Sequence, residues 1–431
     1  MPSTDTIATS ITSAARRYAM VVLAVVYMFN FVDRQILSIL LPAIRDEFQV
    51  GDTVLGLLAG TAFALFYVVL SVPIAQLADR VNRRNLIAVA VALWSVMTAL
   101  SGLAANIWQL GLARIGVGIG EAGCNPPAHS MIADYYPPRR RSTAMGFYTL
   151  GISVGIMLAY LTGGWLVQNI GWREAFFIVG LPGLLLALVV RFTVPEPRRG
   201  ASEQRRDSGS TPRLIVVARF LLARRSFLYM AGAAGLSSFV GYSIINFMPS
   251  FVMRSFGMEI AALGFWLGII YGVAGGFGFF MGGFIADHIG RSGHRRAMFF
   301  IALAVIVTVF FNAAVFLSSS VVWCLALFVI PSVTSHVYLA PVLSQTQSLV
   351  SLRMRAVASS LLLLIINVIG LAMGSPLTGV ISDLLEPGYG PESMRYSLLI
   401  VSSVLLPLAA WCYYQAGKSI EYDLQRAEEH D

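Results

Sequence analysis

Four ionisable side chains lie inside stretches of sequence that are otherwise apolar enough to be buried in a membrane. Asp33 and Arg34 are adjacent in the first such stretch, and Arg114 and Glu121 lie about two helical turns apart in the fourth. The second half of the chain has no charge at a comparable depth. Because a charge in hydrocarbon is costly, these four residues are functional candidates by default.

The types of these residues suggest proton transfer and anion binding. Burial favours the neutral form of a carboxyl group, whereas a nearby arginine favours the carboxylate, so Asp33 and Glu121 are predicted to bind protons near neutral pH. Protonation would release Arg34 or Arg114 to hold a substrate phosphate or carboxylate. The alternative is a structural ion-pair network that only locks helices together, because buried pairs often contribute little net stability.

Helical spacing extends the polar set in the fourth stretch. Five residues there share one helical face: Arg114, Gly118, Glu121, Asn125 and His129. Gly116, Gly120 and Gly123 lie on roughly the opposite face, where small residues let another helix approach closely. We therefore expect one face to pack against a helix and the other to meet a cavity. His129 lies near the inner end of this helix and is interpreted as an interfacial histidine without a special role.

In the first stretch, Tyr27 and Arg34 share a face and Asn30 lies beside it, while Asp33 points toward the cavity rim or a neighbouring helix. The residues predicted to bind substrate are Tyr27, Asn30, Arg34, Arg114, Asn125 and Asn246. The second half offers uncharged groups: Tyr242, Asn246, Asn312, Ser335, Asn367 and a lone His336 interpreted as structural. A charged half facing an apolar half suits an amphiphile with an acidic head, unless the phenylalanines of the second half simply face lipid.

The elements that must position these residues are membrane helices. The chain has 431 residues, of which 57% are hydrophobic and 12% charged. Apolar runs of about 20 residues match the thickness of a bilayer core and lack the two-residue rhythm of a barrel. Twelve are predicted, at about 18–41, 54–77, 85–105, 106–134, 142–168, 175–194, 227–251, 261–286, 296–318, 321–345, 356–382 and 396–416.

Two similar loops indicate that the chain is a duplication. AQLADRVNRR at Ala75–Arg84 and GGFIADHIGR at Gly282–Arg291 each follow the second apolar run of a set of six, 208 positions apart. The predicted fold is all-α and integral to the membrane, with twelve helices in two pseudo-symmetric six-helix bundles around a central site. The predicted units are a tail (1–17), a bundle (18–195), a linker (196–225), a second bundle (226–416) and a tail (417–431).

The net charge of +8 is unevenly distributed. With both termini placed in the cytoplasm, 24 of the 30 Lys and Arg fall in loops and tails on that side. This asymmetry is typical of a multi-pass protein of the cytoplasmic membrane, here predicted to be a bacterial inner membrane. A nucleic-acid partner is not expected, because the basic residues lie in short loops without stacking aromatics.

The repeated loops predict a cytoplasmic gate. Aspartates at the ends of the second and eighth helices can accept backbone N–H groups, and the following arginines can pair with acids at helix ends. Asp134 is a candidate partner for Arg80 or Arg83, and such contacts would break when the gate opens. The predicted gate residues are Asp79, Arg80, Arg83, Asp134, Asp287 and Arg291.

Other function classes find little support in the sequence. Cys124, Cys324 and Cys412 all fall within predicted helices, so a disulfide framework is not expected. The chain has no HExxH motif, no Cys/His cluster and no Ser–His spacing that suggests catalysis. We therefore expect no catalytic residues, metal or cofactor. A sensor usually carries a soluble domain, and none fits in these loops.

These features resemble the major facilitator superfamily. Its loop signature, GxxxD[RK]xG[RK][RK], recurs here with Ala75 and Asn82 in place of the glycines in the first copy, and with His288 as the departure in the second. Within that superfamily the chain most resembles bacterial members of the Spinster-like branch, and the similarity rests on residues 30–48, 114–146, 171–200 and 366–383. The resemblance implies alternating access and proton-linked transport through Asp33, Arg34, Arg114 and Glu121.

The resemblance also indicates the chemical class of the substrate. Eukaryotic Spinster-like proteins are associated with lysophospholipids and sphingosine phosphate, which implies an amphiphilic or acidic solute, lipid-like or drug-like, whose transport is coupled to protons. We expect the protein to be a monomer. A related branch, the organic-anion symporters, shares a similar DRxxLS first helix and a GEA-containing fourth helix. A symporter of sugar acids or aromatic acids is therefore the alternative, and a passive lipid scramblase is a further one.

Overall fold

Helices account for nearly all of the chain that the structure describes. The structure, a computed structural model, describes residues 11–78, 80–199, 214–290, 293–351 and 354–428. Its helices are α1 (Ser13–Phe48), α2 (Asp52–Ala59), α3 (Thr61–Ala78), α4 (Arg83–Ser101), α5 (Ile107–Ala122), α6 (Asn125–Tyr135), α7 (Pro138–Asn169), α8 (Trp172–Thr193), α9 (Leu214–Leu222), α10 (Arg225–Phe256), α11 (Ile260–Ile269), the π-helix η1 (Ile270–Ala274), α12 (Gly275–Gly290), α13 (His294–Leu317), α14 (Val321–Thr334), α15 (Leu339–Ser348), α16 (Arg355–Ile366), the π-helix η2 (Asn367–Ala372), α17 (Gly374–Tyr389), the 3₁₀-helix η3 (Gly390–Glu392) and α18 (Ser393–Glu428).

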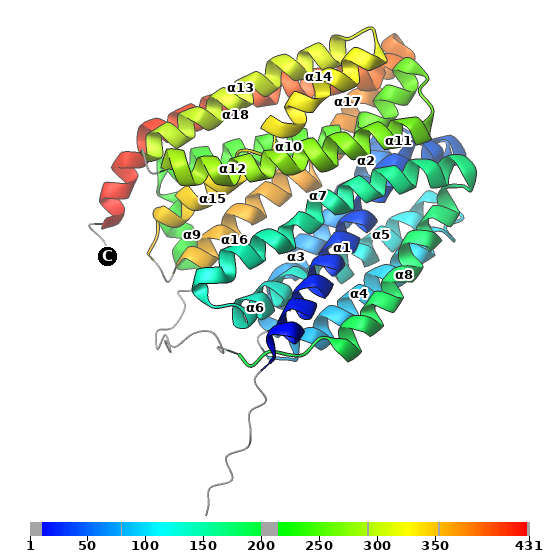
Figure 1. The fold of residues 1–431 in the computed structure, drawn as a ribbon. Coiled ribbons are helices and arrows are strands. Elements are labelled where there is room, and N and C mark those ends of the chain that lie inside the picture. Colours follow the sequence, from blue (N-terminus) through cyan, green and yellow to red (C-terminus); the bar gives the residue numbers. More distant parts are fainter. Residues whose placement is uncertain (1–10, 79, 200–213, 291–292, 352–353, 429–431) are drawn as a thin grey trace, which may run out of the picture.

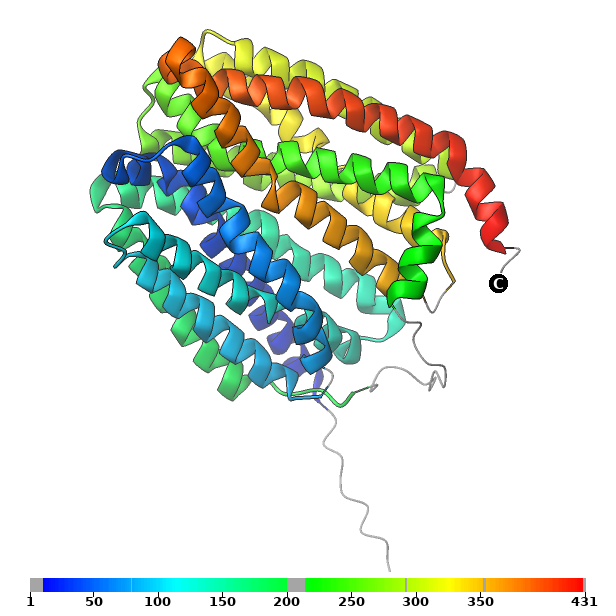
Figure 2. The ribbon, with the colours of Figure 1, turned by 180° about the vertical axis from the view of Figure 1, so that it is seen from behind.

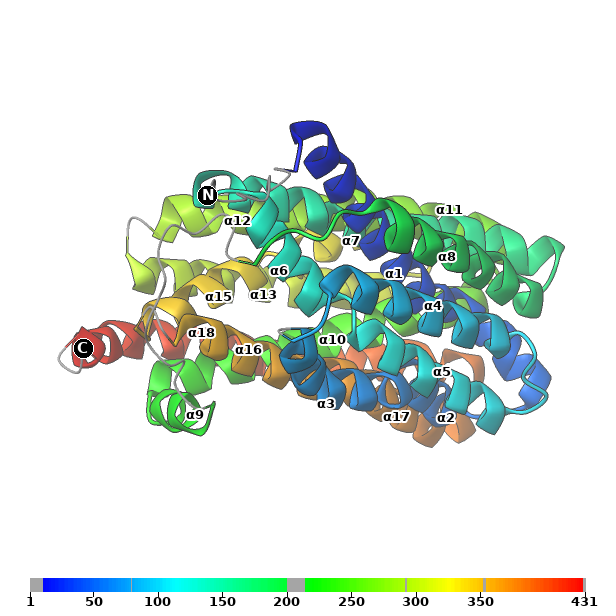
Figure 3. The ribbon, with the colours of Figure 1, turned by 90° about the horizontal axis from the view of Figure 1, so that it is seen from below.

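The helices form two groups that lie side by side. Helices α1–α8, the N half, occupy one side of the molecule, and α10–α18, the C half, occupy the other (Figures 1 and 2). Figure 3 shows the molecule from below, turned by 90° from the view of Figure 1, and most helices there run roughly parallel to one long axis. We call the end where α1 begins and α18 ends the tail end, and the opposite end the far end.

Ten stretches of the described chain are long and apolar enough to cross a membrane. One of them, 357–426, covers 70 residues and contains α16, η2, α17 and α18, which reverse direction at η3 and so account for two crossings. The predicted helix at 106–134 is not among the ten. The structure breaks it at Gly123 and Cys124 into α5 and α6, because Pro126 and Pro127 lack backbone N–H groups and fit only the first turn of a new helix.

The predicted small-residue face of α5 packs as expected. Gly116 and Gly120 lie against Met97 and Trp94 of α4, and Gly123 lies against Ala90 of the same helix. A Cβ added to Gly120 would lie 2.7 Å from the backbone nitrogen of Trp94, so any larger residue would push the two helices apart.

The two halves touch mainly at the far end, where α2 packs on α17 and α7 packs on α11. Both crossings are close, since a Cβ at Gly56 would lie 2.4 Å from the carbonyl oxygen of Ser375, and one at Gly264 2.4 Å from that of Tyr160. At the centre, the Ser38 hydroxyl donates a 2.6 Å hydrogen bond to Asn246. These two residues are 208 positions apart, the spacing of the repeated loops, so the halves meet there through equivalent positions.

Candidate functional site

A cavity of about 870 Å³ lies between the two halves. Its wall includes Arg34 on α1 and Tyr242 on α10, and it reaches Gln76 and Val357 near the tail-end termini of α3 and α16. Because the halves are packed together at the far end, the cavity extends toward the tail end. Its volume is within the range of pockets that enclose a small organic molecule.

Arg34 and Glu121 form an ion pair at the wall of the cavity. Nη2 of Arg34 lies 2.5 Å from Oε2 of Glu121, and Nε lies 3.1 Å from the same oxygen. The side chain of Arg34 is 11% exposed and lines the cavity, whereas Glu121 is fully buried behind it. Within the described residues, Oε1 of Glu121 has no hydrogen-bond partner. One carboxylate oxygen is therefore engaged, and the other can accept a proton.

Aromatic rings surround the guanidinium group of Arg34. Its Cζ atom lies 4.6 Å from the ring centre of Phe63, 4.9 Å from that of Tyr67 and 5.1 Å from that of Phe31. Stacking of this kind stabilises a cation in a poorly hydrated place. These rings lie on α1 and α3 and were not predicted, because their positions in the sequence are simply apolar.

Asp33 and Arg114 form a second pair away from the cavity. Nη1 of Arg114 lies 3.3 Å from Oδ1 of Asp33, and the hydroxyl of Thr98 on α4 donates to Oδ2. Both charged side chains are almost fully buried between α1, α4 and α5. Asp33 was predicted to point toward either the cavity rim or a neighbouring helix. In the structure it points toward the neighbouring helices α4 and α5. The break after Gly123 explains why Arg114 and Asn125, predicted to share a face, have different surroundings.

The other residues predicted to bind substrate also divide into those that line the cavity and those that are buried away from it. Tyr27 and Asn125 line the cavity, and Asn125 accepts a 2.9 Å hydrogen bond from Tyr148 while its Nδ2 lies 3.4 Å from the Tyr67 hydroxyl. Asn30 is buried outside the cavity wall, with no hydrogen-bond partner for its side chain among the described residues. Asn246 is also outside the wall, because its amide is held by Ser38 and by Ser375, 2.7 Å away.

His129 and His336 both line the cavity. The ring of His129 packs edge-on against Tyr148, with 5.4 Å between ring centres. His336 lies 2.8 Å from the carbonyl oxygen of Ser332 through its Nδ1, and its ring packs against Phe279. Among the described residues, no group of His, Cys, Asp and Glu side chains is arranged to hold a metal ion.

The predicted gate is only partly within the described chain. Asp79 and Arg291 lie outside the described residues, as does the side chain of Asp287, and Arg80 is exposed. Arg83 pairs with Asp134 at 2.5 Å and, unexpectedly, with Glu196 at 2.8 Å. All three belong to the N half or the start of the linker, and their contacts are intact while the cavity extends toward this end. This pair therefore braces helices of one half and does not bridge the two halves.

A charged cluster at the far end does bridge the halves, and the sequence analysis missed it. Arg254, near the end of α10, pairs with Asp52 of α2 through both guanidinium nitrogens, at 2.6 and 2.7 Å. Asp383 of α17 accepts hydrogen bonds from the backbone N–H groups of Asp52 and Thr53, and Arg45 pairs with Glu386 at 2.7 Å. We call these six residues the far-end clasp. The available signal was that Arg45 and Arg254 each lie near the end of the first helix of their half.

Two related helix bundles that enclose a central, charged cavity define a membrane transport protein. The family comparison agrees: the chain matches the model of the Major Facilitator Superfamily over residues 23–375 and belongs to that family. It is therefore a multi-pass membrane transporter and not an enzyme.

Individual proteins are also similar to this chain. The chain is 31% identical to an MFS-type efflux pump of Mycolicibacterium smegmatis, over 94% of this chain and 93% of the relative. It is 28% identical to the cis,cis-muconate transport protein of Acinetobacter baylyi, over 60% of this chain and 63% of that protein. Among solved structures it is similar to a bacterial homologue of the human lysosomal transporter Spinster, in an inward-facing and unoccupied conformation. The TM-score is 0.86 and the identity 31%, with 96% of this chain and 99% of that chain covered.

Proposed function

We propose that this protein is a proton-coupled transporter of an acidic, amphiphilic organic solute. The observation that carries the proposal is the Arg34–Glu121 pair at the cavity wall, with one oxygen of Glu121 unpaired. Arg34 is a cation aimed at the cavity, and its present partner can be neutralised by one proton.

The coupling follows from competition for Arg34. When Glu121 is ionised, its carboxylate holds the guanidinium group, and an anionic solute must displace it. When Glu121 is protonated, the attraction is lost and Arg34 is free to bind a solute carboxylate or phosphate. Proton binding and anion binding therefore strengthen one another, and linkage requires that effect to be reciprocal. In this proposal, Asp33 and Arg114 fix the position of α1 against α4 and α5 and add to the electric field at Glu121.

The proposed setting is a bacterial inner membrane, with the protein working as a monomer and both termini in the cytoplasm. The tail end then faces the cytoplasm and the cavity is inward-facing. The excess of Lys and Arg in the tail-end loops supports this orientation. Alternating access would require the far-end clasp to separate and the tail-end helices to close.

A small organic acid is the second candidate solute. The muconate transport protein of Acinetobacter baylyi is a relative of this chain, and a single arginine suffices for a carboxylate. We favour an amphiphile because the cavity is large and much of its C-half wall is apolar, including Ile244, Leu361 and Leu364. Such a wall would desolvate a hydrocarbon segment and gives a small dianion little to bind.

The test compares the wild type with Glu121→Gln in the full-length protein. Binding of dodecanoate and of cis,cis-muconate is measured in lipid nanodiscs by calorimetry at a series of pH values. In the wild type the affinity for the preferred acid should rise as pH falls, because protonation of Glu121 frees Arg34. In Glu121→Gln the affinity should be high at every pH, since glutamine resembles the protonated acid.

Transport gives the matching readout. In liposomes, uptake of the preferred acid driven by a pH gradient should fall at least about tenfold in Glu121→Gln, as expected for loss of a proton-transferring group. Counterflow of labelled acid should persist. Glu421→Gln, on the exposed tail of α18, is the matched control and should behave as the wild type. Full gradient-driven uptake in Glu121→Gln would refute the assignment, and flux that ignores pH in the wild type would indicate a passive scramblase.

A further inference from the structure

The C-half wall of the cavity contains two buried polar side chains that the proposed mechanism does not use. They are Tyr271 in the π-helix η1 and Asn312 on α13, and both line the cavity. Tyr271 is 5% exposed and Asn312 is fully buried. Within the described residues, neither the Tyr271 hydroxyl nor either end of the Asn312 amide has a hydrogen-bond partner.

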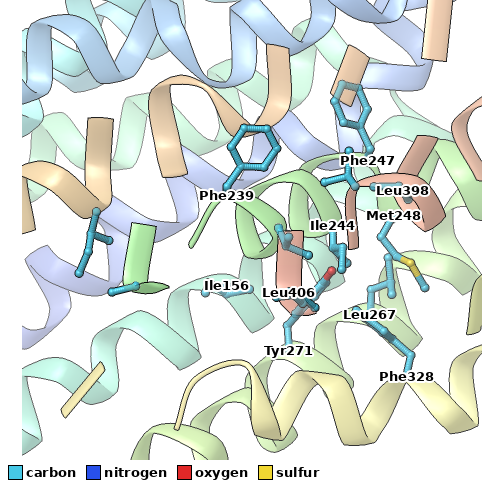
Figure 4. Close-up of a cluster of buried hydrophobic side chains, with 14 of the residues drawn as sticks. Ile156, Phe239, Ile244, Phe247, Met248, Leu267, Tyr271, Phe328, Leu398 and Leu406 are labelled. Carbon is cyan, nitrogen blue, oxygen red and sulfur yellow. The ribbon is translucent and has the colours of Figure 1, made fainter. Parts of the chain in front are cut away.

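Apolar side chains surround the hydroxyl group of Tyr271, whose ring stacks on that of Tyr160 with 5.2 Å between ring centres. In Figure 4 the hydroxyl of Tyr271 points toward Ile244 and lies close to Leu406. The rings of Tyr271 and Phe328 are nearly perpendicular. The ring centres of Tyr271 and Phe328 are 5.5 Å apart. A polar group in such a place is expensive unless something bonds to it, so it is normally paired.

The register of the neighbouring helices brings Asn312 to the same level. Thr308, one turn before Asn312 on α13, hydrogen-bonds Thr334 of α14, and Phe328 lies less than two turns from Thr334. On the other side, Gly417 of α18 lies against Met298 and Phe299 of α13. Helices α13 and α18 are antiparallel. Counting equally far from this contact toward the far end leads to Asn312 on α13 and to a position within one turn of Leu406 on α18. Asn312 and Leu406 therefore lie at a similar level.

We propose that Tyr271 and Asn312 form a second subsite that binds an uncharged hydrogen-bonding group of the solute. This inference rests on the proposed function, in which Arg34 holds the acidic group from the opposite wall. An amide offers a donor and an acceptor, and a phenol can serve as either, so the pair matches a hydroxyl or a carboxamide. It does not match a second charge, which would have no counter-ion in an apolar wall. The solute class is thus an acid whose apolar segment carries a hydroxyl or amide group away from the acid.

The π-helix supplies a structural reason for the position of Tyr271. A π-helical turn widens the backbone and rotates the residues that follow it, and such turns occur frequently at functional sites. Here the turn lies in the eighth predicted span, directly before α12. Asn312 was a candidate polar group from its place in an apolar run, whereas no feature of the sequence selected Tyr271.

The experiment uses ω-hydroxy fatty acids of graded chain length, each paired with the unsubstituted fatty acid of equal length. Dissociation constants are measured with the full-length protein in nanodiscs, and empty nanodiscs correct for partitioning into lipid. At one chain length the wild type should bind the hydroxy acid roughly ten- to a hundredfold more tightly, the range expected when a buried polar group gains its partner. Asn312→Leu should abolish that preference while retaining affinity for the unsubstituted acid.

A second variant and two controls keep the test decisive. Tyr271→Phe removes only the hydroxyl and should reduce the preference without affecting folding. Thr308→Val alters a cavity-lining group that already has a partner in Thr334, and should leave the preference unchanged. Arg34→Gln should weaken both members of each acid pair equally.

The two proposals fail in different ways. If the acids bind in an Arg34-dependent manner but the hydroxyl gives no preference at any length, Tyr271 and Asn312 bind only water and the subsite is refuted while the proposed function stands. If Arg34→Gln has no effect on either acid, the proposed function itself is refuted.

Discussion

The two halves of this transporter differ in whether they bury charges within the membrane-spanning region. In the N half, the four charges inside the membrane-spanning region are joined as two ion pairs, Arg34 with Glu121 and Asp33 with Arg114. In the C half, Tyr271 and Asn312 are uncharged and have no hydrogen-bond partner within the described residues. The halves are related by duplication, so the difference is one of side chains on a common framework.

This difference reflects what each kind of group costs. An unpaired charge in low dielectric is so unfavourable that it must be neutralised or paired, whereas an unpaired hydroxyl or amide is a moderate cost that the fold can bear. The N half can therefore store charge only in pairs that a proton can open. The C half can leave groups waiting for a ligand. In our proposals, proton coupling therefore belongs to the N half and recognition of an uncharged group of the solute belongs to the C half.

The largest expected effect comes from removing one partner of a buried pair. Arg114→Leu leaves the carboxylate of Asp33 with Thr98 alone, and should lower the free energy of unfolding by about 3–5 kcal/mol. The double variant Asp33→Leu/Arg114→Leu should recover much of that loss, because a well-packed apolar pair often replaces an ion pair at little cost. Unfolding by SDS in mixed micelles measures both.

The comparison between halves sharpens this experiment. Asn312→Leu, which removes an unpaired amide, should change stability by less than about 1 kcal/mol or increase it, since no bond is lost. If Asn312→Leu destabilised as much as Arg114→Leu, or if the double variant were as unstable as the sum of its parts, the contrast drawn here would be wrong.

An intermediate effect is expected where charges join the halves. Arg254→Gln removes the double hydrogen bond to Asp52 in the far-end clasp, a contact with a charged partner worth about 1.5–3 kcal/mol. Because the clasp exists only while the far end is closed, the conformational equilibrium should shift more than about tenfold toward an open far end. Spin labels at Asp46 and Leu384, both exposed at the far end, would report the longer distance.

Arg395→Gln is the matched control for this measurement. Arg395 pairs with Glu392 one turn away, within the C half, so its loss should not affect how the halves meet. An unchanged distance distribution in Arg254→Gln, or an equal shift in both variants, would show that the clasp does not hold the far end closed.

The fold followed from the sequence because its causes are local. Apolar length, loop charge and the repeated aspartate loops predict helices, topology and duplication without knowledge of any contact. The site was predicted only in part. Burial cost identified the four charges, but not that they separate into two pairs. That division depends on how α1 and α5 pack, because Asp33 and Arg34 point to different sides of α1 and meet Arg114 and Glu121 at different levels of α5.

Contacts between distant helices were harder still to foresee. The aromatic rings around Arg34 come partly from α3, and the clasp joins α2 with α10 and α17. The residues involved are ordinary in composition, and only the packing of the halves gives them a common location. For the same reason, Asn312 was visible as a polar residue in an apolar run, whereas its place in the wall of the same cavity as Tyr271 was not.

The smallest effect is predicted for a change that removes the partner of an amide oxygen in the N half, where the amide of Asn30 already has no partner within the described residues. Tyr148→Phe removes the hydroxyl that donates to Asn125, a neutral hydrogen bond worth about 0.5–1.5 kcal/mol. Stability should fall by no more than that amount, and affinity for an acid should change less than about threefold, because the Arg34–Glu121 pair is untouched. Tyr414→Phe, at an exposed ring on α18, is the control and should be silent. A loss comparable to that of Arg114→Leu would mean that the neutral groups of the N half are as costly to unpair as its charges. The contrast between the halves would then lie in their packing and not in the kind of polar group that each one buries.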